Sequence, residues 1–156
     1  MIDFNHSTQG YIRCAGSLGW GLSAAMGAKC ALPDRPVLCF SGDGGFWYHI
    51  AELETAVRNN INVVTVINNN SALSQDQRGD ERAYAGLEGG RPEELWSFTD
   101  TNFAAVAESI GCFGVRVERP GDIQGALEQA FASGRPAVVD VATDPLDSLA
   151  PAPWSP

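Results

Sequence analysis

Two polar segments of this chain hold the residue types best suited to bind a metal and a phosphate group. Asp43 lies in the run Gly-Asp-Gly-Gly at positions 42–45, and Asn70 ends a run of three asparagines. A carboxylate, an amide oxygen and a neighbouring backbone carbonyl are hard oxygen ligands, which suit a Mg²⁺ ion that also contacts phosphate. Gly44 and Gly45 lack side chains, so their backbone N–H groups could approach an anion closely at the positive end of a helix. Together the two segments predict a site for a diphosphate bridged by magnesium.

A purely structural interpretation competes with this one. Gly-Asp-Gly is a common turn, and loops that begin with asparagine are also common. Either segment alone therefore favours a turn over a site. Each of them, however, directly follows an apolar run that is predicted to be a buried strand, and this coincidence favours the site.

The elements that position the two segments alternate between short β-branched runs and longer runs of helical spacing. Strands are predicted from Arg35 to Ser41 and from Asn62 to Ile67, and a helix is expected from Phe46 to Arg58 after a glycine turn. Such βαβ units form a largely parallel sheet. In a parallel sheet the loops after neighbouring strands lie at one edge, where ligands bind. We therefore expect Asp43 and Asn70 to face one another.

The rest of the chain extends the same pattern. We expect a doubly wound α/β fold, with helices on both faces of a mostly parallel sheet, over residues 1–145, followed by a proline-rich tail at 146–156. The segment from Ser71 to Pro92 is rich in glycine and poor in apolar residues, so a long loop that covers the site is expected there. The other predicted elements are a glycine-rich entry and helix at 16–31, helices at 102–110 and 122–132, and strands at 112–117 and 137–142.

Composition narrows the class of protein. The 156 residues make about one domain, and 10 basic against 19 acidic residues give a net charge of −9. A negative surface repels nucleic acid and anionic membranes, so neither is an expected partner. No apolar run is long enough to span a membrane, and the N-terminal residues do not resemble a secretory signal, so a cytoplasmic location is expected. Zinc and disulfides are not expected, and buried free thiols are predicted for Cys14, Cys30, Cys39 and Cys112.

Several motifs resemble those of thiamine-diphosphate-dependent enzymes, in the branch that contains acetolactate synthases and 2-oxo acid decarboxylases. The similarity is to the C-terminal, diphosphate-binding domain of these enzymes, and it implies thiamine diphosphate and Mg²⁺ as cofactors. The residues that carry the resemblance are Gly42-Asp43-Gly44, Glu52-Leu53, Thr55-Ala56, Asn69-Asn70, and Gly16-Ser17-Leu18-Gly19 followed by Gly21, Ala24, Ala25 and Gly27.

The resemblance also implies roles for single residues. Asp43 and Asn70 would give side-chain oxygens to Mg²⁺, and Ala72 would give a main-chain carbonyl. The Gly16 carbonyl would accept a hydrogen bond from the aminopyrimidine ring, and Leu18 would wedge between the two rings of the cofactor, although ordinary core packing of Leu18 is an equal alternative. The implied cofactor-binding residues are Gly16, Ser17, Leu18, Gly42, Gly44 and Gly45. A substrate or cofactor contact is open for His6, whereas structural roles are expected for His49 and Glu52.

The implied activity is decarboxylation or carboligation of 2-oxo acids, as in acetolactate synthases. In the family that the chain resembles, a glutamate on a separate pyrimidine-binding domain activates the cofactor, and no segment here resembles that domain. The isolated chain is therefore expected to be inactive and to need a pyrimidine-binding subunit or domain, in a homo- or hetero-oligomer. Met1 to Phe4 resembles the end of a strand that lies further inside the family's domain, so a first strand and helix are expected to be missing. Two other functions stay open: a non-catalytic scaffold and a flavodoxin-like phosphate-binding domain.

Overall fold

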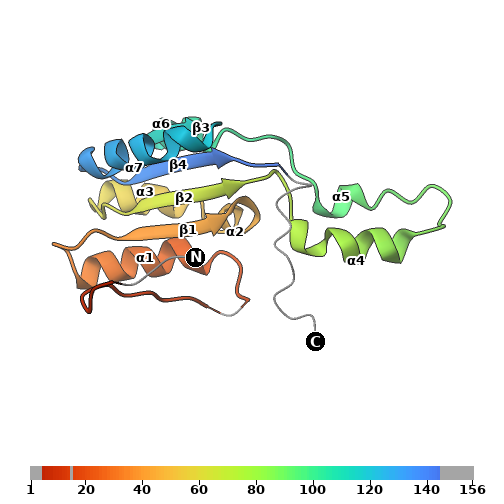
Figure 1. The fold of residues 1–156 in the computed structure, drawn as a ribbon, viewed down its shortest axis with the longest axis horizontal. Coiled ribbons are helices and arrows are strands. Elements are labelled where there is room, and N and C mark those ends of the chain that lie inside the picture. Colours follow the sequence, from red (N-terminus) through yellow and green to blue (C-terminus); the bar gives the residue numbers. More distant parts are fainter. Residues whose placement is uncertain (1–4, 15, 145–156) are drawn as a thin grey trace.

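Four parallel strands form one sheet at the centre of the domain (Figure 1). The computed structural model describes residues 5–14 and 16–144. The strands lie in the order β1-β2-β4-β3, and each neighbouring pair is parallel. All four strands therefore end at the same edge of the sheet. Their bounds are β1 (Leu38–Gly42), β2 (Val64–Asn69), β3 (Phe113–Val117) and β4 (Ala137–Ala142).

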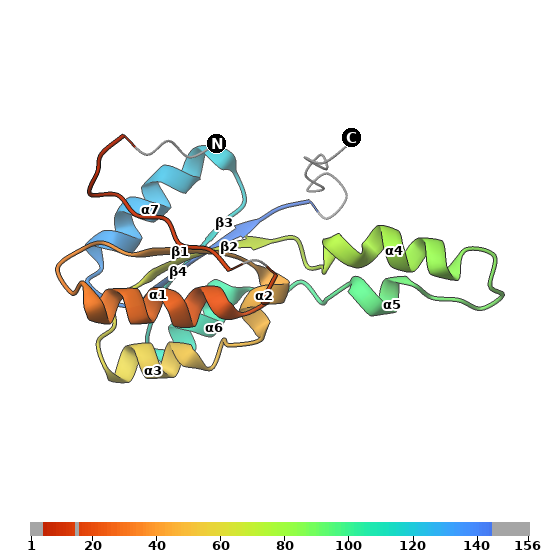
Figure 2. The ribbon, with the colours of Figure 1, turned by 90° about the horizontal axis from the view of Figure 1, so that it is seen from below.

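Helices cover both faces of this sheet. Three of them, α1, α3 and α6, lie on one face, and α7 lies on the other (Figure 2). This arrangement confirms the doubly wound α/β fold that the alternation of strand and helix patterns predicts. The helices are α1 (Trp20–Ala31), α2 (Asp43–Trp47), α3 (Glu52–Arg58), α4 (Ser74–Tyr84), α5 (Glu93–Trp96), α6 (Phe103–Ile110) and α7 (Ile123–Ala132), with a 3₁₀ turn, η1 (Pro120–Asp122), before the last.

Two apolar layers hold the helices to the sheet. Consecutive side chains of a strand point to opposite faces, so in β4 Val138 packs with Phe103 of α6, whereas Val139 packs on the other face with Ala126 and Ala130 of α7. All five of these side chains are buried. Burial of a valine or phenylalanine side chain stabilises the folded state by about 1.5–3 kcal/mol. Because both layers contain such side chains, they hold the sheet, and with it the strand ends that carry the site, in place.

The helix expected from Phe46 to Arg58 is two helices. The first, α2, begins at Asp43 without an intervening glycine turn, and α3 begins at Glu52. Between the two helices, backbone N–H groups donate to the carbonyl three residues earlier, as in a 3₁₀ helix. The Tyr48 N–H donates to the Gly45 carbonyl at 3.4 Å, and the Glu52 N–H donates to the His49 carbonyl at 2.9 Å. The first helix is also fixed by ring contacts, because Phe46 and Trp47 both pack edge-on against Phe103.

The loop expected from Ser71 to Pro92 is wrong for residues 74–84, which form a helix, whereas residues 85–92 form a loop as expected. Helix α4 fills residues 74–84 and α5 follows at residues 93–96. The two helices form an arm, defined here as residues 74–96, that extends away from the sheet (Figures 1 and 2). Its base is held by two backbone bonds, from Leu73 N–H to the Trp96 carbonyl and from Phe98 N–H to the Ser71 carbonyl, both 2.7 Å.

The other predicted elements are confirmed, with ends that shift by a few residues. The burial expected for the strand at 35–41 was wrong, because β1 lies at an edge of the sheet with Leu38 and Phe40 exposed. Cys39 and Cys112 are buried free thiols as expected, but Cys14 and Cys30 are exposed, so burial was wrong for those two. Among residues 5–14 and 16–144, no helix combines the length and apolar character needed to cross a membrane. The predicted strand end at Met1 to Phe4 and the tail at 146–156 lie outside the described residues.

Candidate functional site

All three predicted metal ligands, Asp43, Asn70 and Ala72, line one small cavity at the carboxyl ends of β1 and β2. Asp43 follows β1 directly and Asn70 follows β2, and these two strands are paired up to Gly42 and Asn68. The cavity has a volume of about 160 Å³. Asp43 is 2% exposed and Asn70 is 7% exposed. The sheet therefore brings the carboxylate and the amide to a common cavity, as the strand pattern predicts.

The Asp43 carboxyl group joins the loop after β1 to the loop after β2. Its Oδ2 accepts a hydrogen bond of 3.0 Å from the Ala72 N–H. Burial raises the pKa of Asp43, and backbone N–H groups, among them those of Gly44 and Ala72, oppose that rise. Burial thus disfavours the charged form of Asp43, whereas a divalent cation beside the carboxylate would favour it. The electrostatics of this carboxyl group fit a metal ligand.

Asn70 lies in a tight turn between β2 and the arm. Ser71 adopts a left-handed conformation with φ of 55°, which reverses the chain so that Ala72 comes back to Asp43. The Asn70 Nδ2 donates a hydrogen bond to the Ser74 Oγ at the start of α4. The nitrogen end of the amide is thus engaged by the protein, and the oxygen end is the one with ligand chemistry.

The two glycines after Asp43 bring bare backbone to the cavity wall. A Cβ at Gly44 would lie 2.5 Å from the Leu73 Cδ2, and a Cβ at Gly45 would lie 3.3 Å from the Ser41 Oγ. Both glycines and Gly42 line the cavity. Because the first N–H groups of a helix have no intrahelical acceptor, the start of α2 can donate hydrogen bonds to an anion held there.

The segment before α1 reaches the cavity through Leu18. This side chain lines the cavity and is 51% exposed, so Leu18 does not pack in the core. Gly16 has a positive φ of 96°, and neither it nor Ser17 is among the lining residues. The structure thus brings one of these three predicted residues to the cavity.

The two histidines lie outside the cavity. His6 is in an exposed turn that is closed by hydrogen bonds with Gln9. His49 packs on Gly19, so a Cβ added to Gly19 would lie 2.5 Å from the His49 Cδ2. A packing role is what the sequence favours for His49.

Several residues that line the cavity were not predicted from the sequence. Leu73, Ser74, Gln75 and Asp76 all line the cavity from the base of the arm. The signal that could have revealed this helix is its content of strong helix formers and the spacing of Gln77 and Glu81, whose side chains are hydrogen-bonded at 2.9 Å.

The donor set of the cavity suits a hard cation with few protein ligands. Within the described ranges, no group of three or more His, Cys, Asp or Glu residues is placed to hold a metal ion. One carboxylate, one amide oxygen and a main-chain carbonyl match the habit of Mg²⁺, which takes one or two carboxylates and completes its shell with substrate phosphate and water. The residues present therefore fit a diphosphate-bound Mg²⁺.

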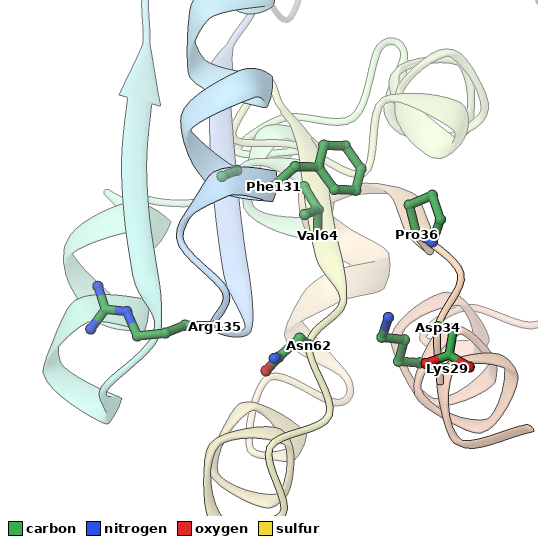
Figure 3. Close-up of a pocket in the computed structure, with 8 residues that line it drawn as sticks. Lys29, Asp34, Pro36, Asn62, Val64, Phe131 and Arg135 are labelled. Carbon is green, nitrogen blue, oxygen red and sulfur yellow. The ribbon is translucent and has the colours of Figure 1, made fainter. Parts of the chain in front are cut away.

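A larger cavity of about 590 Å³ lies near the amino ends of the strands (Figure 3). Two of its polar side chains are engaged with loop backbone: the Lys29 Nζ donates to the carbonyls of Pro33 and Arg35, and the Asn62 Nδ2 donates to the carbonyl of Gly134. Ligands of open parallel sheets bind at the opposite, carboxyl edge. We therefore assign the candidate site to the smaller cavity.

Comparison with known proteins agrees with this assignment. The family model described as "Thiamine pyrophosphate enzyme, C-terminal TPP binding domain" matches residues 2–141. The chain is 39% identical over 137 residues to the acetolactate synthase large subunit IlvG of Mycobacterium tuberculosis, covering 83% of this chain and 23% of that protein. It is 36% identical over 131 residues to the 2-hydroxyacyl-CoA lyase of Arabidopsis thaliana, again covering 83% of this chain and 23% of the relative. Among solved structures, the thiamine diphosphate-dependent 4-hydroxybenzoylformate decarboxylase of Rhodococcus jostii RHA1 matches with a TM-score of 0.69 and 32% identity, over 81% of this chain and 23% of that one.

Proposed function

Because the chain belongs to the thiamine-diphosphate enzyme family, as its C-terminal cofactor-binding domain, we propose that it holds the magnesium and diphosphate end of the cofactor in an enzyme that acts on 2-oxo acids. One observation carries this proposal. Asp43 and Asn70, from the ends of two adjacent strands, are both buried against a single cavity. The chain spans 23% of the length of the relatives described above, so most of such an enzyme lies outside it.

Each part of the cavity has a role in this proposal. The side-chain oxygens of Asp43 and Asn70 and the main-chain carbonyl of Ala72 hold Mg²⁺. Backbone N–H groups at Gly44 and Gly45 donate hydrogen bonds to the diphosphate, and Gly42 leaves room for it. Leu18, which also lines the cavity, would support the rings of the cofactor, and Gly16 and Ser17, which precede it in the chain, would complete this part of the site.

Thiamine diphosphate, when bound, supplies a nucleophilic carbon that adds to a 2-oxo acid and takes up the electrons released by loss of CO₂. This chain's residues fix the cofactor in place and balance its charge. In the metal-free chain Asp43 is buried with a raised pKa, so binding of Mg²⁺ and ionisation of this carboxyl group are coupled.

The activating glutamate is proposed to come from a pyrimidine-binding domain or subunit, so that the complete site forms in a homo- or hetero-oligomer. Decarboxylation and acetolactate-type carboligation are both within the chemistry of the named relatives. We place the cofactor-binding domain at residues 1–145 and the enzyme in the cytoplasm.

Calorimetric titration of thiamine diphosphate into the chain, with and without Mg²⁺, tests the proposal. Metal-dependent binding by the unaltered chain, lost in Asp43→Ala and Asp43→Asn, is the expected result. Asp34→Asn is the matched control, because Asp34 is an exposed carboxylate at the other cavity, and it should bind like the unaltered chain. Absence of metal-dependent binding by the unaltered chain would favour the non-catalytic scaffold instead.

A further inference from the structure

We propose that Asp140 is a positioning residue for the metal-binding turn, defined here as residues 69–72. Asp140 is in β4, on the strand beside β2, and it lines neither cavity. The inference rests on the proposed function, since it assigns to Asp140 the task of fixing the turn that carries two of the three proposed ligands.

Asp140 uses its two carboxylate oxygens for two different segments. Its Oδ1 accepts a hydrogen bond of 2.9 Å from the Asn69 Nδ2, and its Oδ2 accepts one of 2.9 Å from the Phe103 N–H at the start of α6. Arg116 pairs with the same Oδ2 at 3.3 Å. Asp140 is 0% exposed, so the hydrogen bonds of both its oxygens are shielded from water. A hydrogen bond to a charged group is strong in such an environment.

Asn69 transmits this restraint to the proposed ligands. Its Nδ2 also donates to the Thr101 carbonyl at 2.9 Å, so both protons of this nitrogen have acceptors. Its Oδ1 then accepts a hydrogen bond of 3.3 Å from the Ser71 N–H. The turn that follows brings the Ala72 N–H onto Asp43. A continuous series of hydrogen bonds thus leads from Asp140 to the turn and on to the proposed metal ligands.

A role in stability alone would not require this arrangement. Capping the start of α6 needs only one oxygen of Asp140, and the ion pair of Asp140 with Arg116 is weak evidence for a purely stabilising role, although loss of Asp140 alone would leave Arg116 without this partner. The second oxygen is directed at Asn69, which has a side chain on the turn itself. Residues that orient metal ligands in this way typically change metal affinity by about 10–100-fold when they are replaced.

The variant Asp140→Asn tests the proposal, because an amide cannot accept on both sides and one of the two links must break. Magnesium demands near-ideal octahedral geometry, whereas calcium tolerates irregular ligands. The Mg²⁺ concentration for half-maximal binding of thiamine diphosphate should therefore rise about 10–100-fold, and the Ca²⁺ concentration should rise by a clearly smaller factor. Val139→Ala is the control, since Val139 is the neighbouring buried residue on the opposite face, and it should leave the ratio of the two concentrations unchanged.

Asn69→Ala provides a second route that keeps the cap on α6. It should change the Mg²⁺ to Ca²⁺ ratio at least as much as Asp140→Asn does. The double variant should change the ratio no further than Asn69→Ala alone, because Asp140 has no link to the turn once the Asn69 side chain is gone. Equal factors for the two metals in both single variants, or the same change of ratio in Val139→Ala, would overturn the positioning role.

Hydrogen exchange of the metal-free chain separates this inference from the proposed function. In Asp140→Asn and Asn69→Ala the amides of Ser71 and Ala72 should exchange faster than in Val139→Ala. If the unaltered chain binds no cofactor with either metal yet shows this difference, the proposed function fails and the positioning of the turn stands. If exchange at the turn is the same in all three variants, Asp140 does not position it.

Discussion

Replacing Gly114 with alanine should destabilise the domain through one close contact between α6 and β3. A Cβ at this position would lie 2.8 Å from the Glu108 Cγ and 2.9 Å from the backbone carbon of Ala104, and closer still to the Ala104 carbonyl oxygen. Helix backbone cannot rotate away as a side chain can, so α6 as a whole must shift. Overpacking costs about 1–3 kcal/mol, and we expect Gly114→Ala to be near the upper end of that range.

Gly27→Ala is the matched comparison, with the opposite sign. Gly27 lies within α1, and a Cβ there would meet nothing within 4 Å. Alanine in a helix interior is favoured over glycine by about 1 kcal/mol, so this variant should be more stable than the unaltered chain. Urea unfolding gives both free energies. At this chain length about 1 kcal/mol corresponds to about 2–4 °C in Tm, so Gly114→Ala should lower Tm by about 6–12 °C. Stability of Gly114→Ala within about 0.5 kcal/mol of the unaltered chain, the range typical of neutral surface changes, would refute the argument from the close contact.

Two further predictions concern ionisable groups in the metal-free chain. Burial raises the pKa of Asp43 above its ordinary 3.8, so the folded state binds this proton more tightly than the unfolded state does. The free energy of unfolding, relative to that of Asp43→Asn, should therefore increase as the pH falls from neutral towards 3.8. Urea unfolding at several pH values checks this, and a difference between the two proteins that does not change with pH would contradict it. Burial also raises the pKa of Cys39 and Cys112 to about 11, so iodoacetamide at neutral pH should modify the exposed Cys14 and Cys30 quickly and the other two only after unfolding. Mass spectrometry would show the order of modification, and early modification of Cys39 would contradict the burial of its side chain.

Sequence patterns were sufficient for the sheet and for the meeting of Asp43 with Asn70. The strands are short, largely apolar runs, and the two that carry the site end at glycine (β1) or asparagine (β2), so the local pattern also indicates where these two strands end. In a parallel sheet the ends share an edge, so the position of the cavity follows once the strands are known. Membership of the thiamine-diphosphate family then leaves the flavodoxin-like alternative without support.

Contacts between distant segments explain what the patterns missed. The break between α2 and α3 occurs where Phe46 packs on Phe103 and His49 packs on Gly19, and helical spacing alone carries no information about either partner. Helix α4 of the arm consists mostly of charged and amide residues, and its buried residue is Gln77, so it lacks the apolar stripe that usually predicts a helix. No local pattern predicts a role for Asp140, because its two oxygens accept hydrogen bonds from residues that lie 71 and 37 positions away in the sequence.

The exposed edge strand of this domain has a consequence for its behaviour in concentrated solution. Among the strands of the described residues, β1 has a neighbour on one side only, and in it Leu38 is 46% exposed and Phe40 is 68% exposed. Apolar side chains on an unpaired edge attract the same edge of another copy, and the net charge of −9 opposes that approach. Charge repulsion reaches only about 10 Å at 0.1 M salt and about 3 Å at 1 M. The colloidal stability of the isolated domain therefore depends on ionic strength, and added salt removes the barrier that keeps the copies apart.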